Sequence, residues 1–312
     1  MLSSVFDPNN VPSLAGRVFF ITGGTAGLGA RSISLLAAGK PAHIYFSGRN
    51  TKKADELIAS LNAKHPDVPV TFIQCDLADL NSVKQAAKTF LAQSQRLDVL
   101  YANAGIMALP PGQTKDGYEI QFGTNHLGHA HLINLLLPLM LLTAEEPNSD
   151  VRIINMSSIA YKQAPNEGIA FETLKTPQAN LGSMIPGGKW TRYGQSKLAN
   201  MLYAKELAER YPSIKTVSVH PGYIKTDIFA NVSFMTTLPV RVAVPLGAGW
   251  TPVEEGAYNQ TWAGTTERAK LEDGAYYVPI GRKGQLETKQ SKDGDLSKRL
   301  WDWTQKELAE FS

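Results

Sequence analysis

Residues 17–29 read Arg17-Val-Phe-Phe-Ile-Thr22-Gly-Gly-Thr-Ala-Gly-Leu-Gly29, a β-branched and aromatic run followed directly by a glycine-rich turn. The run predicts a buried strand over 17–22, and Ala30–Ala38 continues as a helix. Strand, glycine turn and helix in this order form a cradle for a pyrophosphate, because glycines let the backbone approach and the helix N-terminus offers unpaired N–H groups. A tight turn without a ligand is the alternative for the glycines alone. The placement favours a dinucleotide-binding fold.

Segments of the same two kinds alternate along the rest of the chain. Strands are predicted over 42–47, 68–74, 97–102, 151–156, 214–219 and 274–280. Helices are predicted over 50–64, 81–95, 115–142, 191–211, 253–265 and 296–311. This alternation predicts a doubly wound Rossmann fold, a seven-stranded and mostly parallel α/β sheet with helices on both faces.

No linker or internal repeat divides the sequence, so we expect one domain over 1–312. Within it, 161–189 is an insertion broken by prolines and glycines, and long irregular segments are often functional. Residues 229–265 begin with an apolar stretch and are interpreted as a substrate-covering region, with core packing as the alternative. Residues 294–312 hold a C-terminal helix.

The composition is that of an ordinary soluble globule, with 43% hydrophobic and 19% charged residues and a formal net charge of +3. Lysine and arginine are scattered, so we expect no nucleic-acid partner. Cys75 is the only cysteine, which excludes an intrachain disulfide and a multi-cysteine metal site, and we expect no metal. No signal peptide is evident, and the longest apolar run, Leu132–Leu142, is too short to span a bilayer. We therefore expect a cytoplasmic protein without a membrane span.

The end of the second predicted strand bears on the choice of cofactor. In a dinucleotide fold an acid at this point accepts from the ribose 2′-OH of NAD, whereas an arginine accommodates a 2′-phosphate. Ser47-Gly48 contains no acid, and Arg49 follows it. We therefore expect NADP(H) to be preferred over NAD(H). The alternative is that Arg49 is a solvated turn residue.

Tyr193 and Lys197 lie four residues apart, on one face of a predicted helix. A phenol titrates near pH ~10, and a neighbouring ammonium favours the phenolate and lowers that pKa toward values useful in general acid–base catalysis. The same spacing occurs in surface pairs, so the pair needs a cofactor site and a pocket beside it.

Other predicted strand ends and helices carry polar or small residues. Asp76 follows the third strand and has a turn-capping role as its alternative. Asn103-Ala104-Gly105 follows the fourth strand, where a ligand crevice is expected. Asn125 lies in mid-helix, where it competes with backbone bonding.

Together these features resemble the short-chain dehydrogenase/reductase family over essentially the whole chain. The matching motifs, in family order, are Thr22-Gly-Gly-Thr-Ala-Gly-Leu-Gly29, Asn103-Ala-Gly105, Asn125, Ser158, Tyr193-x-x-x-Lys197 and Pro221-Gly222. The segment Gly-Thr-Asn125-His-Leu-Gly-His and the long gap before Tyr193 are most similar to the branch with retinol dehydrogenases and protochlorophyllide reductases, and to fungal short-chain reductases.

The resemblance implies roles for individual residues. Tyr193 would exchange a proton with the substrate oxygen, Lys197 would lower its pKa and hold the nicotinamide ribose, and Ser158 would hydrogen-bond the substrate oxygen. Asn125 would interrupt helical bonding and hold a water that relays protons to Lys197. Asn103 would also stabilise the central strands. The implied cofactor-binding residues are Gly23, Thr25, Gly27, Leu28, Gly29, Arg49, Asp76, Leu77, Asn103, Ala104, Gly105, Tyr193, Lys197, Pro221, Gly222, Ile224 and Thr226.

The sequence thus predicts an NADP(H)-dependent oxidoreductase that acts on a carbonyl or secondary alcohol of a bulky apolar small molecule. Hydride transfer to a carbonyl builds charge on oxygen, which a hydroxyl donor and a proton-ready phenol stabilise. The alternatives are a reductase of an activated C=C bond and a non-catalytic NADP-binding regulatory protein. The resemblance also implies a homodimer through the helices that hold Asn125 and Tyr193, and the insertion leaves a monomer open.

Overall fold

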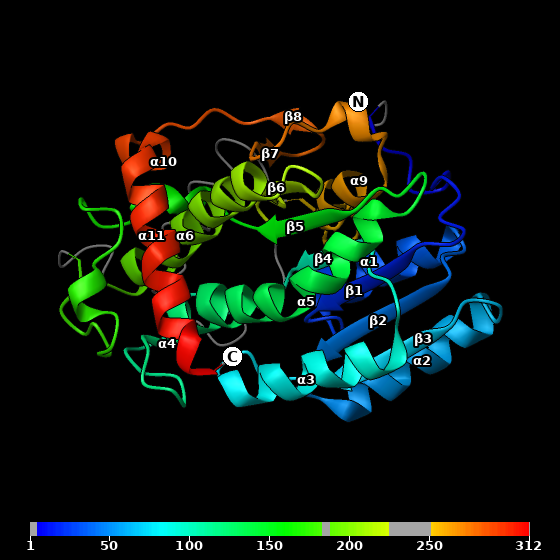
Figure 1. Ribbon diagram of the computed structural model, residues 1–312, viewed down its shortest axis with the longest axis horizontal. Helices are drawn as coiled ribbons and strands as arrows, with labels where there is room; N and C mark the ends of the chain where they lie inside the picture. The colour runs from blue at the N-terminus through cyan, green and yellow to red at the C-terminus, as the bar shows by residue number, and fades with distance from the viewer. Residues whose placement is uncertain (1–4, 183–187, 225–250, 312) are drawn as a thin grey trace.

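The computed structural model describes residues 5–182, 188–224 and 251–311, and an eight-stranded sheet forms its centre (Figure 1). The strands are β1 Val18–Thr22, β2 His43–Gly48, β3 Val70–Gln74, β4 Val99–Ala102, β5 Arg152–Met156, β6 Lys215–Val219, β7 Tyr276–Val278 and β8 Arg282–Lys283. Their order is β3-β2-β1-β4-β5-β6-β7-β8, and only β7 and β8 pair antiparallel. The order reverses between β1 and β4, which places a crevice beyond the carboxyl ends of these strands.

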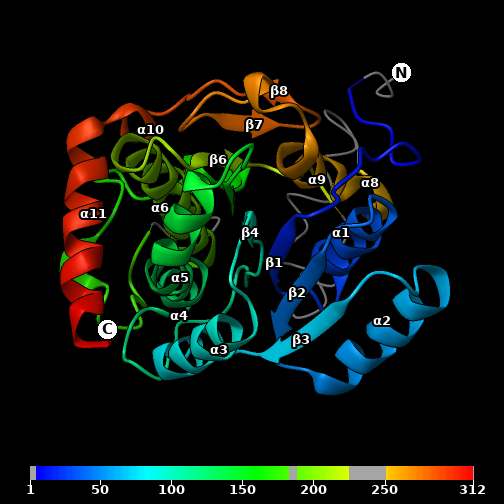
Figure 2. The same ribbon diagram turned by 45° about the vertical axis from the view of Figure 1, so that its right-hand side comes forward.

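Helices cover both faces of the sheet (Figure 2). Their bounds are α1 Gly27–Ala38, α2 Thr51–Lys64, α3 Leu80–Gln93, α4 Ile120–Phe122, α5 Gly128–Glu145, α6 Gly188–Arg210, α8 Val253–Gly256, α9 Tyr258–Thr265, α10 Lys289–Lys292 and α11 Gly294–Leu308. The side chains of α3, α5, α6 and α11 share one core with the sheet, and those of α1, α2 and α9 share the other.

Alternation along β1 explains the two cores. Phe19 and Ile21 point into the core of α1, α2 and α9, whereas Phe20 points into the opposite core. All three are fully buried. Burying one such side chain stabilises the fold by about 1.5–3 kcal/mol, so residues 17–22 anchor both layers at once.

The doubly wound α/β fold is confirmed, and some predicted bounds are wrong. The sheet has eight strands instead of seven, because a turn at Gly281, with φ +65°, sends the exposed pair β8 back along β7. A two-residue strand has no periodic pattern to detect. The predicted helix over 115–142 begins only at Ile120, because Glu119 caps it by accepting from Phe122 N.

The two unusual predicted segments differ in their packing. Insertion 161–189 carries short 3-10 turns in its described part, Ile159–Gln163 and Phe171–Thr173, and it contacts α6 and α10. Most of the apolar stretch in 229–265 lies outside the described residues. The described part of 229–265 forms α8 and α9, and α9 packs in the core beside α1. The covering role of the apolar stretch stays a prediction.

One helical run, Ile120–Glu145, is long and apolar enough to cross a membrane, judged by length and composition within the described ranges. This helical run is longer than the apolar run Leu132–Leu142 because the helix continues beyond both ends of Leu132–Leu142. Within its apolar window, 61% is buried inside the molecule. Burial of this kind is what a core helix shows.

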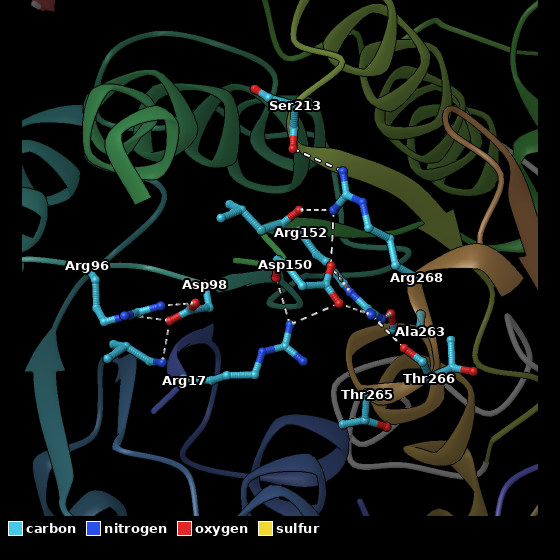
Figure 3. A network of polar contacts seen from close by, with 12 residues as sticks. Arg17, Arg96, Asp98, Asp150, Arg152, Ser213, Ala263, Thr265, Thr266 and Arg268 are labelled. Atoms are coloured by element: carbon cyan, nitrogen blue, oxygen red, sulfur yellow. Dashed lines mark hydrogen bonds and ion pairs between the residues drawn. The ribbon is translucent and has the colours of Figure 1, made fainter. Parts of the chain in front are cut away.

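The amino ends of β4 and β5 carry a network of charged side chains (Figure 3). Asp98 is 1% exposed, receives two hydrogen bonds from Arg96 and accepts Val18 N–H at 2.7 Å. Arg152, also 1% exposed, donates to Asp150 and to two carbonyls at the end of α9. The charged groups of Asp98 and Arg152 are therefore satisfied by hydrogen bonds to other residues of the protein.

Candidate active site

A cavity of about 550 Å³ lies at the carboxyl ends of the central strands, at the switch in strand order. Most of the residues predicted from the sequence line it, namely Gly23, Thr25, Gly27, Leu28, Gly29, Arg49, Asp76, Leu77, Asn103, Ala104, Gly105, Tyr193, Lys197 and Pro221. The chain therefore brings its glycine turn and its Tyr–Lys pair to one pocket.

The glycine turn leaves the start of α1 open. Gly23 has φ +68°, and a Cβ at Gly29 would lie 2.3 Å from the carbonyl oxygen of Gly23, so neither position tolerates a side chain without strain. The N-cap residue Ala26 provides no side-chain hydrogen bond, whereas Asn50 and Asp79 cap α2 and α3 with their own side chains. The first N–H groups of α1 are thus available to an anion.

A compact set of hydrogen bonds joins the ends of β1 and β4 beneath this turn. Asn103 Nδ2 donates to the carbonyl of Thr22 at 2.7 Å. The hydroxyl of Thr22 accepts from the backbone N–H groups of Asn103 and Ala104 at 2.9 and 3.0 Å. Asn103 therefore lies where the resemblance places it, between the central strands and the pocket.

Tyr193 and Lys197 are buried on α6 and reach the pocket from one face of that helix. Lys197 Nζ lies 5.8 Å from the centroid of the Tyr193 ring and donates to the carbonyl of Met156 at 3.0 Å. Burial raises the pKa of the Tyr193 phenol to about 12, opposed by its hydrogen bond with the Ser158 side chain. Burial lowers the pKa of the Lys197 ammonium to about 8. The expected lowering of the Tyr193 pKa is therefore outweighed by burial in this geometry.

Asn125 lies in the π-helical turn Gly123–Leu127 between α4 and α5, which is the break in helical bonding expected there. Asn125 Oδ1 accepts from Ile106 N at 2.8 Å, and Asn125 Nδ2 donates to the carbonyl of Ile106 at 2.9 Å. Nδ2 also donates to Ser196 Oγ at 2.9 Å. A Cβ at Gly105 would lie 3.2 Å from Asn125 Oδ1 and 3.5 Å from Lys197 Nζ. Asn125 therefore lies beside Lys197, although it does not itself line the pocket.

The remaining predicted residues lie at the margin of the site. Ser158 contacts Tyr193 and caps the following 3-10 turn by accepting from Ala160 N at 3.2 Å. Asp76 lines the pocket and also accepts from Ala78 N at 3.0 Å, so its turn role is present as well. Like Asn125, the predicted residues Ser158, Gly222 and Ile224 do not line the pocket, whereas Ser157, the residue before Ser158, does. Thr226 lies outside the described residues.

Two pocket residues on α4 and the π-helical turn were missed from the sequence. Ile120 and Thr124 line the pocket, and the Thr124 hydroxyl is buried with no hydrogen-bond partner in the described structure. The spacing of four residues was the available signal, since both lie on the helical stretch that carries Asn125. An unpartnered buried hydroxyl in a pocket is available to a ligand.

A buried ion pair beside Tyr193 was also missed. Arg192 Nε lies 3.3 Å from Glu119 Oε1, and both side chains are at most 1% exposed. The guanidinium also donates to the carbonyls of Gln178 in the insertion and Leu109 in the pocket wall. Arg192 thus ties the described part of the insertion to the site. Its partners come from distant segments, so no local pattern announces it.

The sequence and fold of this chain are similar to those of known proteins. The family model described as short chain dehydrogenase matches residues 17–176. Short-chain dehydrogenase/reductase drtF of Aspergillus calidoustus is 37% identical over 316 residues, covering 96% of both chains. A putative uncharacterized protein from Mycobacterium paratuberculosis is 27% identical with a TM-score of 0.71, covering 97% of both chains. A blue fluorescent protein from a metagenomic library, in complex with NADPH, is 27% identical with a TM-score of 0.64, covering 86% of this chain and 98% of its own.

Proposed function

This chain belongs to the short-chain dehydrogenase/reductase family of oxidoreductases, and on that premise we propose that it transfers a hydride between NADP(H) and a carbonyl or secondary alcohol. The observation that carries the proposal is the meeting of Tyr193 and Lys197 with the glycine turn at one pocket, with Ser158 hydrogen-bonded to Tyr193 beside it. Tyr193 is the general acid and base, and Ser158 orients the substrate oxygen. The apolar lining by Ile106, Leu109 and Met156 supports a bulky apolar substrate.

The residues present fit a dinucleotide. The uncapped start of α1 and the close approach at Gly29 suit the pyrophosphate, and the unpartnered hydroxyl of Thr124 is available to the same ligand. Asp76 and Leu77 would flank the adenine, and Lys197 would hold the nicotinamide ribose. A bound nicotinamide supplies or accepts the hydride.

The rim at the end of β2 supports NADP(H) over NAD(H). Arg49 is exposed, lines the pocket and has no acidic partner among the described residues, so its guanidinium is available to a 2′-phosphate. A Cβ at Gly48 would lie 2.8 Å from the Thr25 side chain, so an acid for the NAD ribose has little room there.

The protonation states of the buried pair suit carbonyl reduction. With its pKa raised to about 12, Tyr193 keeps its proton at neutral pH and gives it to an oxygen that gains negative charge. With its pKa at about 8, Lys197 remains mostly an ammonium near pH ~7 and stabilises the phenolate that forms. The proton therefore moves from Tyr193 Oη to the substrate oxygen as that oxygen becomes a hydroxyl.

The test is NADPH oxidation over a panel of ketones, aldehydes and enones, with product analysis and with Tyr193→Phe as the variant. We expect alcohol products and a loss of about 10²–10⁴-fold in kcat for Tyr193→Phe, with NADPH affinity retained. A saturated ketone as the product would show that the enzyme reduces the C=C bond and not the carbonyl. NADPH binding without turnover of any panel member would overturn the proposal.

A further inference from the structure

His129 is a buried residue on α5 whose contacts the proposed reaction leaves without a role. Its side chain is 2% exposed. Its Nδ1 lies 2.9 Å from the carbonyl oxygen of Asn125, and its Nε2 lies 2.8 Å from Thr22 Oγ1. One ring nitrogen therefore contacts the π-helical turn beside Lys197, and the other contacts the end of β1 beneath the glycine turn.

These partners select one tautomer of the imidazole. A carbonyl oxygen only accepts, so the proton lies on Nδ1 and points to Asn125. Burial lowers the pKa of His129 to about 4, so the ring is neutral and Nε2 is an acceptor. The Thr22 hydroxyl has two acceptors within reach, Nε2 at 2.8 Å and the carbonyl of Tyr101 at 3.3 Å, and the shorter contact assigns its proton to Nε2. The same oxygen accepts from the N–H groups of Asn103 and Ala104.

We propose that His129 is a positioning residue that couples the cofactor side of the site to its catalytic side. Through Thr22, one arm fixes the backbone of Asn103, which lines the pocket. The other arm holds the carbonyl of Asn125 and with it the turn beside Lys197. The kinetic consequence rests on the proposed hydride transfer and the affinity change on the proposed NADP(H) binding, whereas the tautomer rests on neither.

A second buried histidine provides a matched control. His126 is 1% exposed, and its Nε2 lies 2.9 Å from Thr304 Oγ1 on α11. Burial lowers the pKa of His126 to about 3, so it too is neutral. The same kind of histidine–threonine pair thus exists twice, once toward the site and once toward α11.

Two substitutions separate the arms of His129 in the full chain. The short amide of His129→Asn reaches only the Asn125 carbonyl, and the longer amide of His129→Gln reaches toward Thr22. Loss of one buried hydrogen bond corresponds to about fivefold in an equilibrium or rate. We expect His129→Asn to raise the Kd for NADPH about fivefold with kcat within about twofold of wild type. We expect His129→Gln to lower kcat about fivefold with Kd within about twofold.

The spectroscopic readout is the ¹⁵N resonance pair of His129 in histidine-labelled protein, where a neutral ring protonated on Nδ1 is expected. The control His126→Gln should lower Tm while Kd and kcat both stay within about twofold. A ring protonated on Nε2, a charged ring, or parallel changes in Kd and kcat for both His129 variants would overturn the proposal. If no substrate is turned over, the proposed function fails, and the tautomer and the Kd for NADPH still decide the Thr22 arm.

Discussion

The amino ends and the carboxyl ends of the central strands, here called the amino edge and the carboxyl edge of the sheet, are both rich in polar groups. The two edges use these groups in opposite ways. At the amino edge, Asp98 and Arg152 are buried and bound by other parts of the chain (Figure 3). At the carboxyl edge, the start of α1 has no side-chain cap and the Thr124 hydroxyl has no partner in the described residues. Buried polar groups are normally satisfied within a fold. The polar groups of the amino edge are therefore used within the fold, and those of the carboxyl edge are available to the ligand proposed above.

The largest effect that separates the edges is expected from Asp98→Ala. The substitution leaves the Val18 N–H buried without its acceptor and removes the bidentate partner of Arg96. An orphaned buried N–H costs about 1–3 kcal/mol, and the lost hydrogen bonds from Arg96, whose side chain is 33% exposed, add to that cost. The free energy of unfolding should therefore fall by about 3 kcal/mol in urea titrations. The kcat of the folded fraction should remain close to that of the wild type, because no pocket-lining residue changes.

Glu146→Ala is the matched control for this prediction. Glu146 pairs with the same Arg96 at 2.8 Å, but its side chain is 46% exposed. An exposed pair contributes about 0–1 kcal/mol, so the control should leave the unfolding curve almost unchanged. Equal losses for the two variants would show that the buried network is not what stabilises the amino edge.

A smaller effect, confined to the carboxyl edge, is expected from Arg49→Gln. The guanidinium is available to a 2′-phosphate, and the loss of such a charged contact should raise the Kd for NADPH about 10- to 100-fold. NADH binding and Tm should not change. Fluorescence titration with NADPH and with NADH measures the Kd of each nucleotide for the variant and the wild type.

Lys52→Gln is the control for Arg49→Gln, because Lys52 is an exposed cation near Arg49 that does not line the pocket. A similar loss of NADPH affinity in both variants would indicate general electrostatic attraction, and the assignment of the 2′-phosphate contact to Arg49 would then be wrong.

Much of the fold was predictable because its signals are local. Residues 17–29 contain a strand, a turn and the start of a helix whose order fixes the crossover, and the other main strands are short apolar runs. The additional strand β8 was not predictable, since two exposed residues bury nothing and depend on the turn at Gly281.

The candidate site was predictable only where its residues form motifs. Tyr193 and Lys197 share a helix face, and their convergence on the glycine turn follows from the parallel sheet. The buried roles of Arg192 and His129 were not predictable, because their partners Glu119 and Thr22 are distant in sequence. A charged or titratable residue inside a helix carries no local sign of which distant group it will meet.

The smallest expected effect is a pH dependence that distinguishes the edges. Burial lowers the pKa of Lys197 to about 8, below its ordinary value of 10.5, so the folded chain loses this proton as the pH rises through about 8. The charge beside Tyr193 is then lost, and kcat/KM for reduction should be about tenfold lower at about pH 9 than on its plateau near about pH 7. The measurement is kcat/KM against pH with NADPH saturating.

Stability should follow the opposite course over the same interval. Because the folded pKa of Lys197 lies below the unfolded one, the unfolded chain binds more protons between about pH 8 and pH 10.5, and this group makes unfolding less favourable as the pH rises. At the amino edge, burial raises the pKa of Asp150, but the hydrogen bond from Arg152 and nearby arginine charges outweigh it and hold that pKa below 3.8. The contribution of Asp150 is therefore present above about pH 4 and is lost only in acid.

A parallel fall of kcat/KM and of the free energy of unfolding between about pH 7 and about pH 9 would mean that one event controls both edges, and the separation of their roles would not hold.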